Sequence, residues 1–236
     1  MKIVVILIFS IIMISCETTP SKTFFNWYEP WENAYNVNNS IFLGENEEPK
    51  IFISTDINED FYIIRAKYYY CIGKTSFNGP DEDHRNSIKK QCQQNGATLA
   101  LYSKRYSDTR SGIIGSSGYV SSYTIRRYDY TVYYFVPMKN IPEILKFFGA
   151  DCYNLTDELR QKTGRNTGAY VNIVYDDSPA FFANIQRNDV IISINDQKIN
   201  NEDDFYNILL NYNPGETIEV AYIRNNQPFK TNVELK

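Results

Sequence analysis

The stretch "DSPAFFANIQRNDVIISINDQKI" (residues 177–199) decides the fold of the C-terminal part of the chain. Ser178 followed by Pro179 predicts the N-cap and the first position of a short helix. Residues 190–194 form a β-branched run of strand length. Asn195 and Asp196 tolerate positive φ, so they predict a tight turn into a second strand. The stretch therefore predicts helix, turn, strand, tight turn and strand.

Two further asparagines carry the same backbone prediction. Asn184 stands where the short helix should end, and Asn188 stands at the turn that enters the strand. A left-handed residue is favoured at both kinds of position, and asparagine is the next choice after glycine. We therefore expect positive φ at Asn184 and Asn188.

The composition of the chain is that of a globular protein. Its 236 residues are 43% hydrophobic and 22% charged, with a formal net charge of −4, and they include 20 tyrosines. This length suffices for one large or two small domains. No basic block occurs along the sequence, so we expect no nucleic-acid partner.

The N-terminal segment predicts a secretory signal. Lys2 precedes an apolar run at residues 3–14. As a helix this run spans about 18 Å, which is too short for a ~30 Å hydrocarbon core. Ser15-Cys16 ends the run and resembles a bacterial lipobox, in which the cysteine thiol receives a diacylglycerol. The alternative is an ordinary secretory signal with a coincidental cysteine.

The lipobox resemblance implies a lipoprotein. Residues 1–15 would be the signal peptide, and residues 16–48 a lipidated tether held in the membrane by acyl chains on Cys16. The expected location is the bacterial cell envelope. Glu17 after the cysteine, rather than Asp, favours the outer membrane. Apart from this covalent lipid we expect no cofactor and no small-molecule substrate.

Six aromatic residues lie in the tether, and they have two interpretations. They are Phe24, Phe25, Trp27, Tyr28, Trp31 and Tyr35. We favour packing onto the folded body, because an exposed cluster of this size promotes aggregation. The alternative is contact with the membrane interface.

Residues 49–137 predict a tyrosine-rich α+β domain. We expect strands at residues 50–56 and 60–73, a helix from Asp81 to the C-cap Gly96, and a strand at 97–106. The Gly/Ser-rich segment 112–123 predicts a loop before a long final strand. The order suggests a small α/β sandwich with the helix on one face of the sheet. Parts of this region resemble uncharacterised bacterial lipoproteins, a likeness that implies no chemistry.

The three remaining cysteines allow at most one disulfide. Cys71, Cys92 and Cys152 are an odd number in an oxidising compartment. Cys92 lies four residues after Ile88 on the predicted helix, so we expect it to point inward. No pair or cluster of cysteine and histidine has metal-ligand spacing, so no metal site is predicted.

Residues 138–145 predict a linker, because Pro137 and Pro142 bracket them. Residues 146–236 then resemble a PDZ domain of the type attached to trypsin-like periplasmic proteases. The matching motifs occur in order: Phe147-Phe148-Gly149-Ala150, Gly168-Ala169-Tyr170-Val171, Ser178-Pro179-Ala180, Asp189-Val190-Ile191, Ile194-Asn195-Asp196, a helix over residues 201–212, and Pro214-Gly215-Glu216-Thr217. Asparagines replace several glycines of the family pattern without changing the expected backbone. The resemblance implies a partly open β-barrel capped by two helices.

The PDZ resemblance implies that the domain binds the C-terminal ends of peptides or proteins as an added strand. The backbone N–H groups of Phe148, Gly149 and Ala150 would hold the terminal carboxylate, with Lys146 and Phe147 beside them. Phe148, Ala150, Tyr206, Leu209 and Leu210 would line the pocket for the last side chain. Plain core packing is the alternative for Phe148 and Leu209. Gly149 would keep the approach of the anion clear.

Residues for catalysis are not apparent in the sequence. The only histidine, His84, lies in a charged helix start and should face solvent, and no nucleophile motif accompanies it. We therefore expect no enzyme but an envelope adaptor or scaffold. The alternatives are a non-catalytic accessory subunit of an envelope protease or quality-control system, and a structural protein whose groove its own chain fills.

Overall fold

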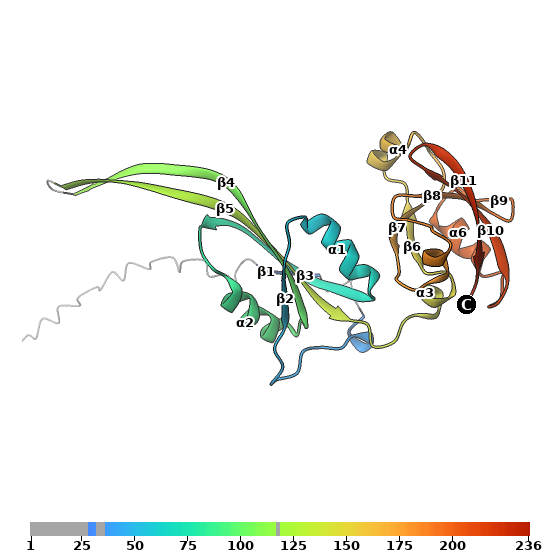
Figure 1. The fold of residues 1–236 in the computed structure, drawn as a ribbon, viewed down its shortest axis with the longest axis horizontal. Helices are drawn as coiled ribbons and strands as arrows, with labels where there is room; N and C mark the ends of the chain where they lie inside the picture. The colour runs from blue at the N-terminus through green and yellow to red at the C-terminus, as the bar shows by residue number, and fades with distance from the viewer. Residues whose placement is uncertain (1–27, 32–35, 117–118) are drawn as a thin grey trace, which may run out of the picture.

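The computed structural model describes residues 28–31, 36–116 and 119–236 of the chain. They form two units, each built on one β-sheet, so the predicted α+β class is confirmed (Figure 1). Among the described residues, no helix is long and apolar enough to cross a membrane. Cys16, Phe24, Phe25, Trp27 and Tyr35 lie outside the described residues, so the predictions for them stay predictions.

The first unit is a five-stranded sheet with the strand order β1-β3-β5-β4-β2. Its strands are β1 (Tyr28–Pro30), β2 (Lys50–Ile53), β3 (Tyr69–Pro80), β4 (Leu99–Ser116) and β5 (Tyr119–Pro137). Its helices are the 3-10 helix η3 (Val37–Asn39), α1 (Ile57–Ala66) and α2 (Arg85–Asn95). Tyr28 pairs across β1 with Thr75, and Trp31 packs against Tyr133, which confirms the packing interpretation for these two aromatics.

The two longer helices cover opposite faces of this sheet. Ile88 and Cys92 of α2 pack in one buried cluster with Ala100 of β4, whereas Ile64 of α1 packs in another with Leu101. Successive residues of a strand point to opposite faces. The helix predicted before Gly96 does lie on one face of the sheet, as α2, and the inward position of Cys92 is confirmed. Helix α1 on the opposite face was not expected.

Helix α1 replaces the first half of the strand expected at residues 60–73. The Asp56 side chain accepts a hydrogen bond from the Glu59 N–H (3.1 Å) and begins the helix. Phe61 and Ile64 then share the face that packs on the sheet. The Phe-Tyr-Ile-Ile run has a preference for strand, but it forms a helix here because an N-cap and a helical spacing of apolar residues act together.

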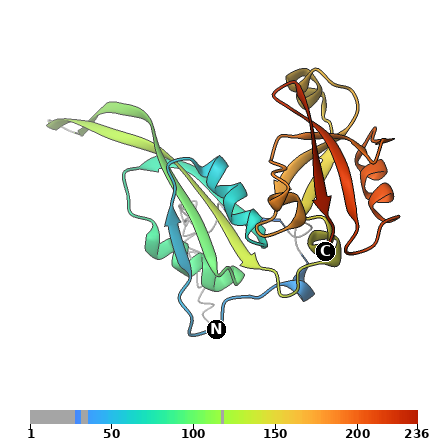
Figure 2. The same ribbon diagram turned by 45° about the vertical axis from the view of Figure 1, so that its right-hand side comes forward.

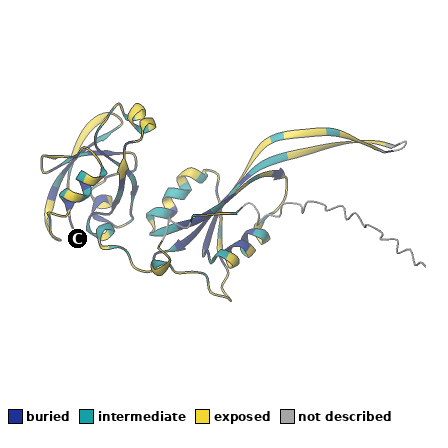
Figure 3. Cartoon of the chain, turned by 180° about the vertical axis from the view of Figure 1, so that it is seen from behind, coloured by how far each residue is buried: buried dark blue, intermediate teal, exposed yellow. Residues whose placement is uncertain are grey.

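The segment expected to be a loop at residues 112–123 is the end of a long hairpin. β4 and β5 stay in antiparallel register from Leu99↔Phe135 to Ser116↔Tyr119. The Tyr123 ring lies where a side chain at Gly112 would be, within 2.7 Å of the position of a Cβ. Glycine here admits an aromatic ring from the opposite strand, so the Gly/Ser-rich sequence continues the ribbon instead of ending it. The hairpin extends away from both units (Figures 1 and 3).

The second unit is a six-stranded sheet with the order β11-β10-β8-β7-β6, and β9 pairs with β8. Its strands are β6 (Ala150–Asn154), β7 (Ala169–Val174), β8 (Val190–Ile194), β9 (Gln197–Lys198), β10 (Thr217–Arg224) and β11 (Gln227–Glu234). Its helices are α3 (Glu143–Phe147), α4 (Asp157–Thr163), α5 (Pro179–Phe182) and α6 (Glu202–Leu209). The core includes Phe148, Phe205, Leu209, Ile191 and Val220.

The backbone predictions for the stretch 177–199 are confirmed. Ser178 caps α5 by accepting a hydrogen bond from the Phe181 N–H, with Pro179 at the first position. Asn184 and Asn188 have φ values of 58° and 76°, and the turn at Asn195-Asp196 is also left-handed. Asparagine thus supplies the conformations that glycine would otherwise provide.

The two units contact each other through α1 and the residues that follow it (Figure 2). The Tyr68 and Tyr175 rings stack with centroids 4.9 Å apart, and Lys67 forms an ion pair with Asp176 (2.7 Å). Arg187 forms an ion pair with Glu59 (2.6 Å). The three cysteines Cys71, Cys92 and Cys152 are buried free thiols.

Candidate functional site

Strand β6 forms one end of the second sheet and presents its outer edge to helix α6. β6 pairs on one side with β7, from Ala150↔Val174 to Asn154↔Ala169. The Cys152 N–H points to the other side, where it donates a hydrogen bond to the Tyr206 hydroxyl (3.2 Å). Because residues two apart in a strand point the same way, Ala150 also presents its backbone groups to this edge.

Helix α6 is fixed beside this edge at two levels. Its N-cap is Asn201, and the Asn154 side chain of β6 accepts a hydrogen bond from the Glu202 N–H (2.9 Å). One turn later the Tyr206 hydroxyl accepts from Cys152. Burial raises the pKa of Tyr206, so its hydroxyl stays neutral at physiological pH. The space between α6 and β6 is therefore bridged by hydrogen bonds.

The loop before β6 is held by its carbonyl groups. The Phe148 carbonyl accepts from the Ala180 N–H (2.8 Å), and the Gly149 carbonyl accepts from the Tyr175 N–H (2.9 Å) and the Ser178 hydroxyl (3.1 Å). The Phe148 N–H already donates to the Ile144 carbonyl of α3 (3.3 Å). These bonds fix the loop against α5 and α3.

Gly149 is required here for two structural reasons. Its φ is +88°, in the left-handed region. A Cβ at this position would lie 2.0 Å from the Ser178 Cβ, closer than any packing allows. The expected reason was the approach of an anion, but the structure shows that a side chain at Gly149 would first displace α5.

A hollow of about 280 Å³ opens at the C-terminal end of α6, next to this loop. Its walls are mostly apolar, and Glu143 and Lys236 lie at its rim. The apolar lining residues are Ile144, Phe147, Leu209, Leu210, Tyr212 and Pro214. An apolar hollow at the end of a helix that lies beside a sheet edge fits an extended peptide that ends in a hydrophobic side chain.

The sequence model of the PDZ domain family matches residues 148–235, which include this edge, the loop and α6. The C-terminal unit is a PDZ domain. PDZ domains are non-catalytic modules, and the match leaves residues 28–147 outside the family. The comparison with curated proteins found no match.

Solved structures similar to the chain include the HtrA3 PDZ domain bound to a phage-derived ligand (FGRWV). That likeness has 21% identity and a TM-score of 0.35, and covers 38% of this chain and 84% of the other. The HtrA-type protease AlgW with a decapeptide is 25% identical, with a TM-score of 0.36 and 52% of this chain covered. A variant of AlgW with a decapeptide is 23% identical, with a TM-score of 0.36 and 54% covered. The chain spans 39% and 40% of these two proteases, respectively.

The structure brings some of the predicted site residues of the PDZ domain together and separates others. Phe147, Leu209 and Leu210 line the hollow, and Tyr206 lies at the strand edge. Phe148 is buried in the core with its ring 5.2 Å from that of Phe205, and Ala150 is also buried there. The predicted charge of Lys146 is balanced by Glu143 (2.8 Å).

Sequence reasoning missed the residues of β6 beyond Ala150. Cys152 and Asn154 supply the N–H and the side chain that contact α6. The signal that would have found them is the two-residue period of a strand, since both lie at even spacing from Ala150. Ile144, Tyr212 and Pro214 of the hollow lacked such a signal, because they come from separate segments of the chain.

A buried ion pair holds the opposite side of the PDZ domain. The Arg224 guanidinium donates two hydrogen bonds to the Asp189 carboxylate, both 2.7 Å long, and one to the Asn184 carbonyl (2.7 Å). Asp189 also accepts from the Gln186 N–H (2.8 Å). This bidentate pair is structural, because it fastens the turn after α5 to β10.

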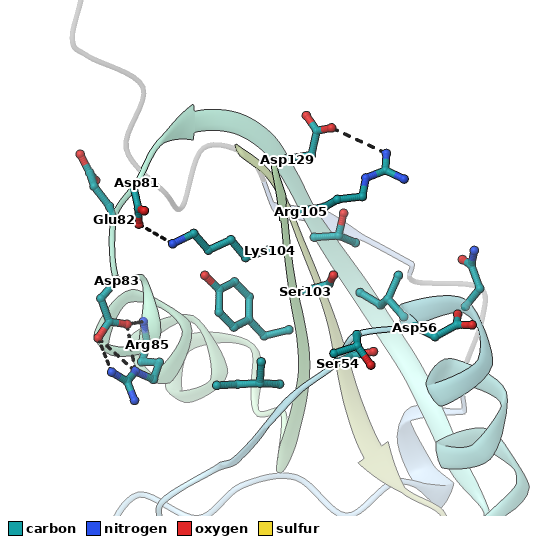
Figure 4. A pocket seen from close by; sticks show the side chains of 16 residues that line it. Ser54, Asp56, Asp81, Glu82, Asp83, Arg85, Ser103, Lys104, Arg105 and Asp129 are labelled. Atoms are coloured by element: carbon teal, nitrogen blue, oxygen red, sulfur yellow. Dashed lines mark hydrogen bonds and ion pairs between the residues drawn. The ribbon is translucent and has the colours of Figure 1, made fainter. Parts of the chain in front are cut away.

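A second cavity of about 860 Å³ lies in the first unit (Figure 4). Six of its charged side chains contact one another in pairs: Lys104 with Asp81, Arg85 with Asp83 (2.6 Å), and Arg105 with Asp129 (3.8 Å). Within the described ranges, no group of three or more acidic, histidine or cysteine side chains is placed to hold a metal ion.

His84 differs from its expected position near this cavity. It was expected to face solvent, but it is half-buried, with its ring 4.6 Å from that of Tyr130 and 5.1 Å from that of Phe77. Burial lowers its pKa. The aromatic contacts explain this position, so His84 is a packing residue.

Proposed function

We propose that the PDZ domain binds the C-terminal ends of peptides or proteins, and that the chain acts as an adaptor. The peptide would lie as an added strand along the outer edge of β6, beside α6. The observation that supports this is the Cys152 N–H, which points away from β7 to the outer edge of the sheet. The apolar hollow and the loop at Gly149 lie where the end of such a peptide would be.

The hollow at the end of α6 would receive the last side chain of the peptide. Its apolar lining, which includes Phe147 and Leu210, favours a hydrophobic residue. The terminal carboxylate would lie near the backbone of the loop at Gly149, whose carbonyls are held on the far side by Tyr175 and Ser178. Because the Phe148 N–H already donates to Ile144, the N–H groups of Gly149 and Ala150 would be the ones that hold the anion.

The test measures the affinity of hydrophobic-ended peptides for the chain by fluorescence polarisation. We expect micromolar binding, and a loss of roughly tenfold to a hundredfold when the peptide is amidated, because charge-assisted hydrogen bonds to the carboxylate are lost. Leu210→Glu should weaken binding through repulsion at the hollow, without unfolding the domain, since Leu210 is 74% exposed. Val37→Glu, on the exposed helix η3, is the matched control.

Two results would contradict the proposal. Equal affinity for free and amidated peptides would indicate recognition of internal sequences. No binding across a diverse peptide library would favour a packing role for the domain.

Anchoring in the envelope through a lipid on Cys16, with an outer-membrane location, forms part of this proposal. It is supported by the lipobox resemblance of residues 13–16. Labelling with a tagged fatty acid should mark the wild type and not Cys16→Ala. Equal labelling of both would exclude a lipid at this position.

A further inference from the structure

The sequence has no charged residue from position 111 to position 125, and the ends of β4 and β5 that fall in this range project from the body (Figure 1). Within this range we define the hairpin arms as residues 111–115 and 120–125. Ile113, Ile114 and Val120 of the arms are 74%, 66% and 78% exposed. Three aliphatic side chains this exposed, close together on a projecting ribbon, form an apolar patch of the kind that marks an interaction surface.

The apolar side chains of the arms lie on both faces of the ribbon. Ile113 and Val120 share one face, because Gly115 pairs with Val120 and lies two residues from Ile113. Ile114 lies on the other face with Tyr123 and Ile125. A protein surface stacked on the ribbon would cover one face only, whereas a fluid apolar layer would surround both.

The base of the hairpin is basic, although the whole chain has a formal net charge of −4. Five basic residues accompany two acidic ones: Lys104, Arg105, Arg110, Arg126 and Arg127 against Asp108 and Asp129. Arg110 and Arg126 border the uncharged segment, and both are exposed, although Arg110 also contacts Asp108 (3.2 Å). Basic side chains next to an apolar segment fit a surface of anionic lipid headgroups.

We propose that the hairpin arms insert into the surface of a membrane that contains anionic phospholipid. From Arg110 to Ile114 the strand spans about 13 Å, which is less than the ~15 Å of one hydrocarbon leaflet. The arginines therefore reach the headgroups when the isoleucines reach the acyl chains. Tyr123 and the serines of the arms suit the interfacial region between them.

The backbone of the hairpin limits the depth of this insertion. β2 pairs with β4 only along Leu99–Tyr102, and β3 pairs with β5 only as far as Arg127, so the arms have open edges. Open sheet edges are not stable inside hydrocarbon, where no water satisfies their N–H and C=O groups. The arms consequently lie in the interfacial layer and do not span the bilayer.

The experiment measures co-sedimentation of the chain from Glu17 onward, which lacks the N-terminal apolar run and keeps every described element. The vesicles consist of phosphatidylcholine, with or without phosphatidylglycerol. We expect binding to the anionic vesicles, and a loss of at least about tenfold in the double variant Ile113→Ser/Ile114→Ser because apolar burial is lost. Val37→Ser is the control for an exposed aliphatic residue on the body and should bind like the wild type.

A second double variant separates the charge contribution. Arg110→Gln/Arg126→Gln should weaken binding to the anionic vesicles by on the order of tenfold, and added salt should do the same to the wild type. Thermal melts confirm that each variant is folded. Wild-type protein that binds neither vesicle would overturn the proposal, as would an isoleucine variant that binds like the control. Self-association that depends on Ile113 and Ile114, without vesicle binding, would assign the arms to a second copy of the chain instead.

Discussion

The outer edge of β6 and the outer edges of the β4–β5 hairpin are both sheet edges beyond the reach of a neighbouring strand, yet they are protected differently. α6 lies along β6, with its Tyr206 hydroxyl on the Cys152 N–H. No described helix packs along the hairpin arms in this way, and they project from the body (Figure 1). One edge is covered by a helix at the distance of a hydrogen bond, and the other is open.

This difference indicates what each edge can accept. A helix beside an edge admits one extended peptide and selects it by the side chains that face the groove. The base of the hairpin is protected from indiscriminate strand pairing by charged residues such as Lys104 and Arg105. The arms lack that protection, so their apolar side chains need a medium that does not pair with the backbone.

The largest expected effect comes from breaking the buried ion pair of the PDZ domain, which lies on the side opposite the covered edge. Arg224→Met would leave the Asp189 carboxylate, which is 1% exposed, without its cation. Removing one partner of a buried ion pair typically costs 3–5 kcal/mol, and we expect about 3 kcal/mol because Arg224 itself is 19% exposed. Urea unfolding of the full chain should show this loss in the transition of the PDZ domain, while vesicle binding by the hairpin is unchanged.

Two variants control this prediction. Asp189→Asn in the Arg224→Met background should recover part of the stability, because no buried charge then remains unpaired. Arg160→Met removes an exposed pair with Asp157 and should cost no more than about 1 kcal/mol. Equal effects of Arg224→Met and Arg160→Met would show that the buried pair contributes no more than an exposed one.

The PDZ domain, which contains the covered edge, is the part of the fold that the sequence predicted well, although the residues of β6 beyond Ala150 were missed. In the stretch 177–199 each turn depends on local backbone preferences, such as the left-handed conformations of Asn184 and Asn188. The residue types alone predict these preferences. The C-terminal end of helix α2 is similar, since Gly96 ends it with a φ of 77°. Its N-terminal end was predicted less well, since the helix begins at Arg85 and not at Asp81. Such local backbone preferences are kept in the folded protein because no tertiary contact there favours a different conformation.

The open edge belongs to the part that the sequence did not predict. Gly112 and its neighbours predict a loop by composition, and only the register with β5 shows that Tyr123 fills the place of the missing side chain. Helix α1 was also missed, because its strand-like residues are overruled by a cap at Asp56 and by packing on the sheet. The first error comes from a long-range contact, which single-sequence patterns do not contain. The second combines such a contact with a local cap at Asp56 that the sequence analysis did not use.

In the candidate site, too, the local motif was predicted and the long-range contact was not. The loop at Gly149 was located by its motif, but its packing against Ser178 was not, because Ser178 is 29 residues away in sequence. For this reason a substitution at Gly149 would disturb the packing of α5, and its effect on peptide affinity would not report on carboxylate binding. A variant that tests the groove has to remove a group whose hydrogen bond is made to the strand edge alone.

Tyr206→Phe is that variant, and its expected effect is the smallest. The change removes the hydroxyl that accepts from the Cys152 N–H and keeps the ring in place. In the free protein the N–H then loses its partner, whereas in the complex a peptide carbonyl supplies one. At a net value of about 1 kcal/mol for one hydrogen bond, peptide affinity should rise roughly fivefold.

Tyr170→Phe provides the matched control for this increase. Its hydroxyl donates to the Asn188 side chain (2.5 Å) at a position on β7, away from the edge that α6 covers. Peptide affinity should be unchanged in this variant, as measured by the same polarisation assay. If Tyr206→Phe binds peptides no more tightly than Tyr170→Phe does, the Cys152 N–H is not a contact of the ligand. Helix α6 would then block the edge of β6 in both the free and the peptide-bound protein. The β6 edge would be closed to strand addition, and only the hairpin edges would be open.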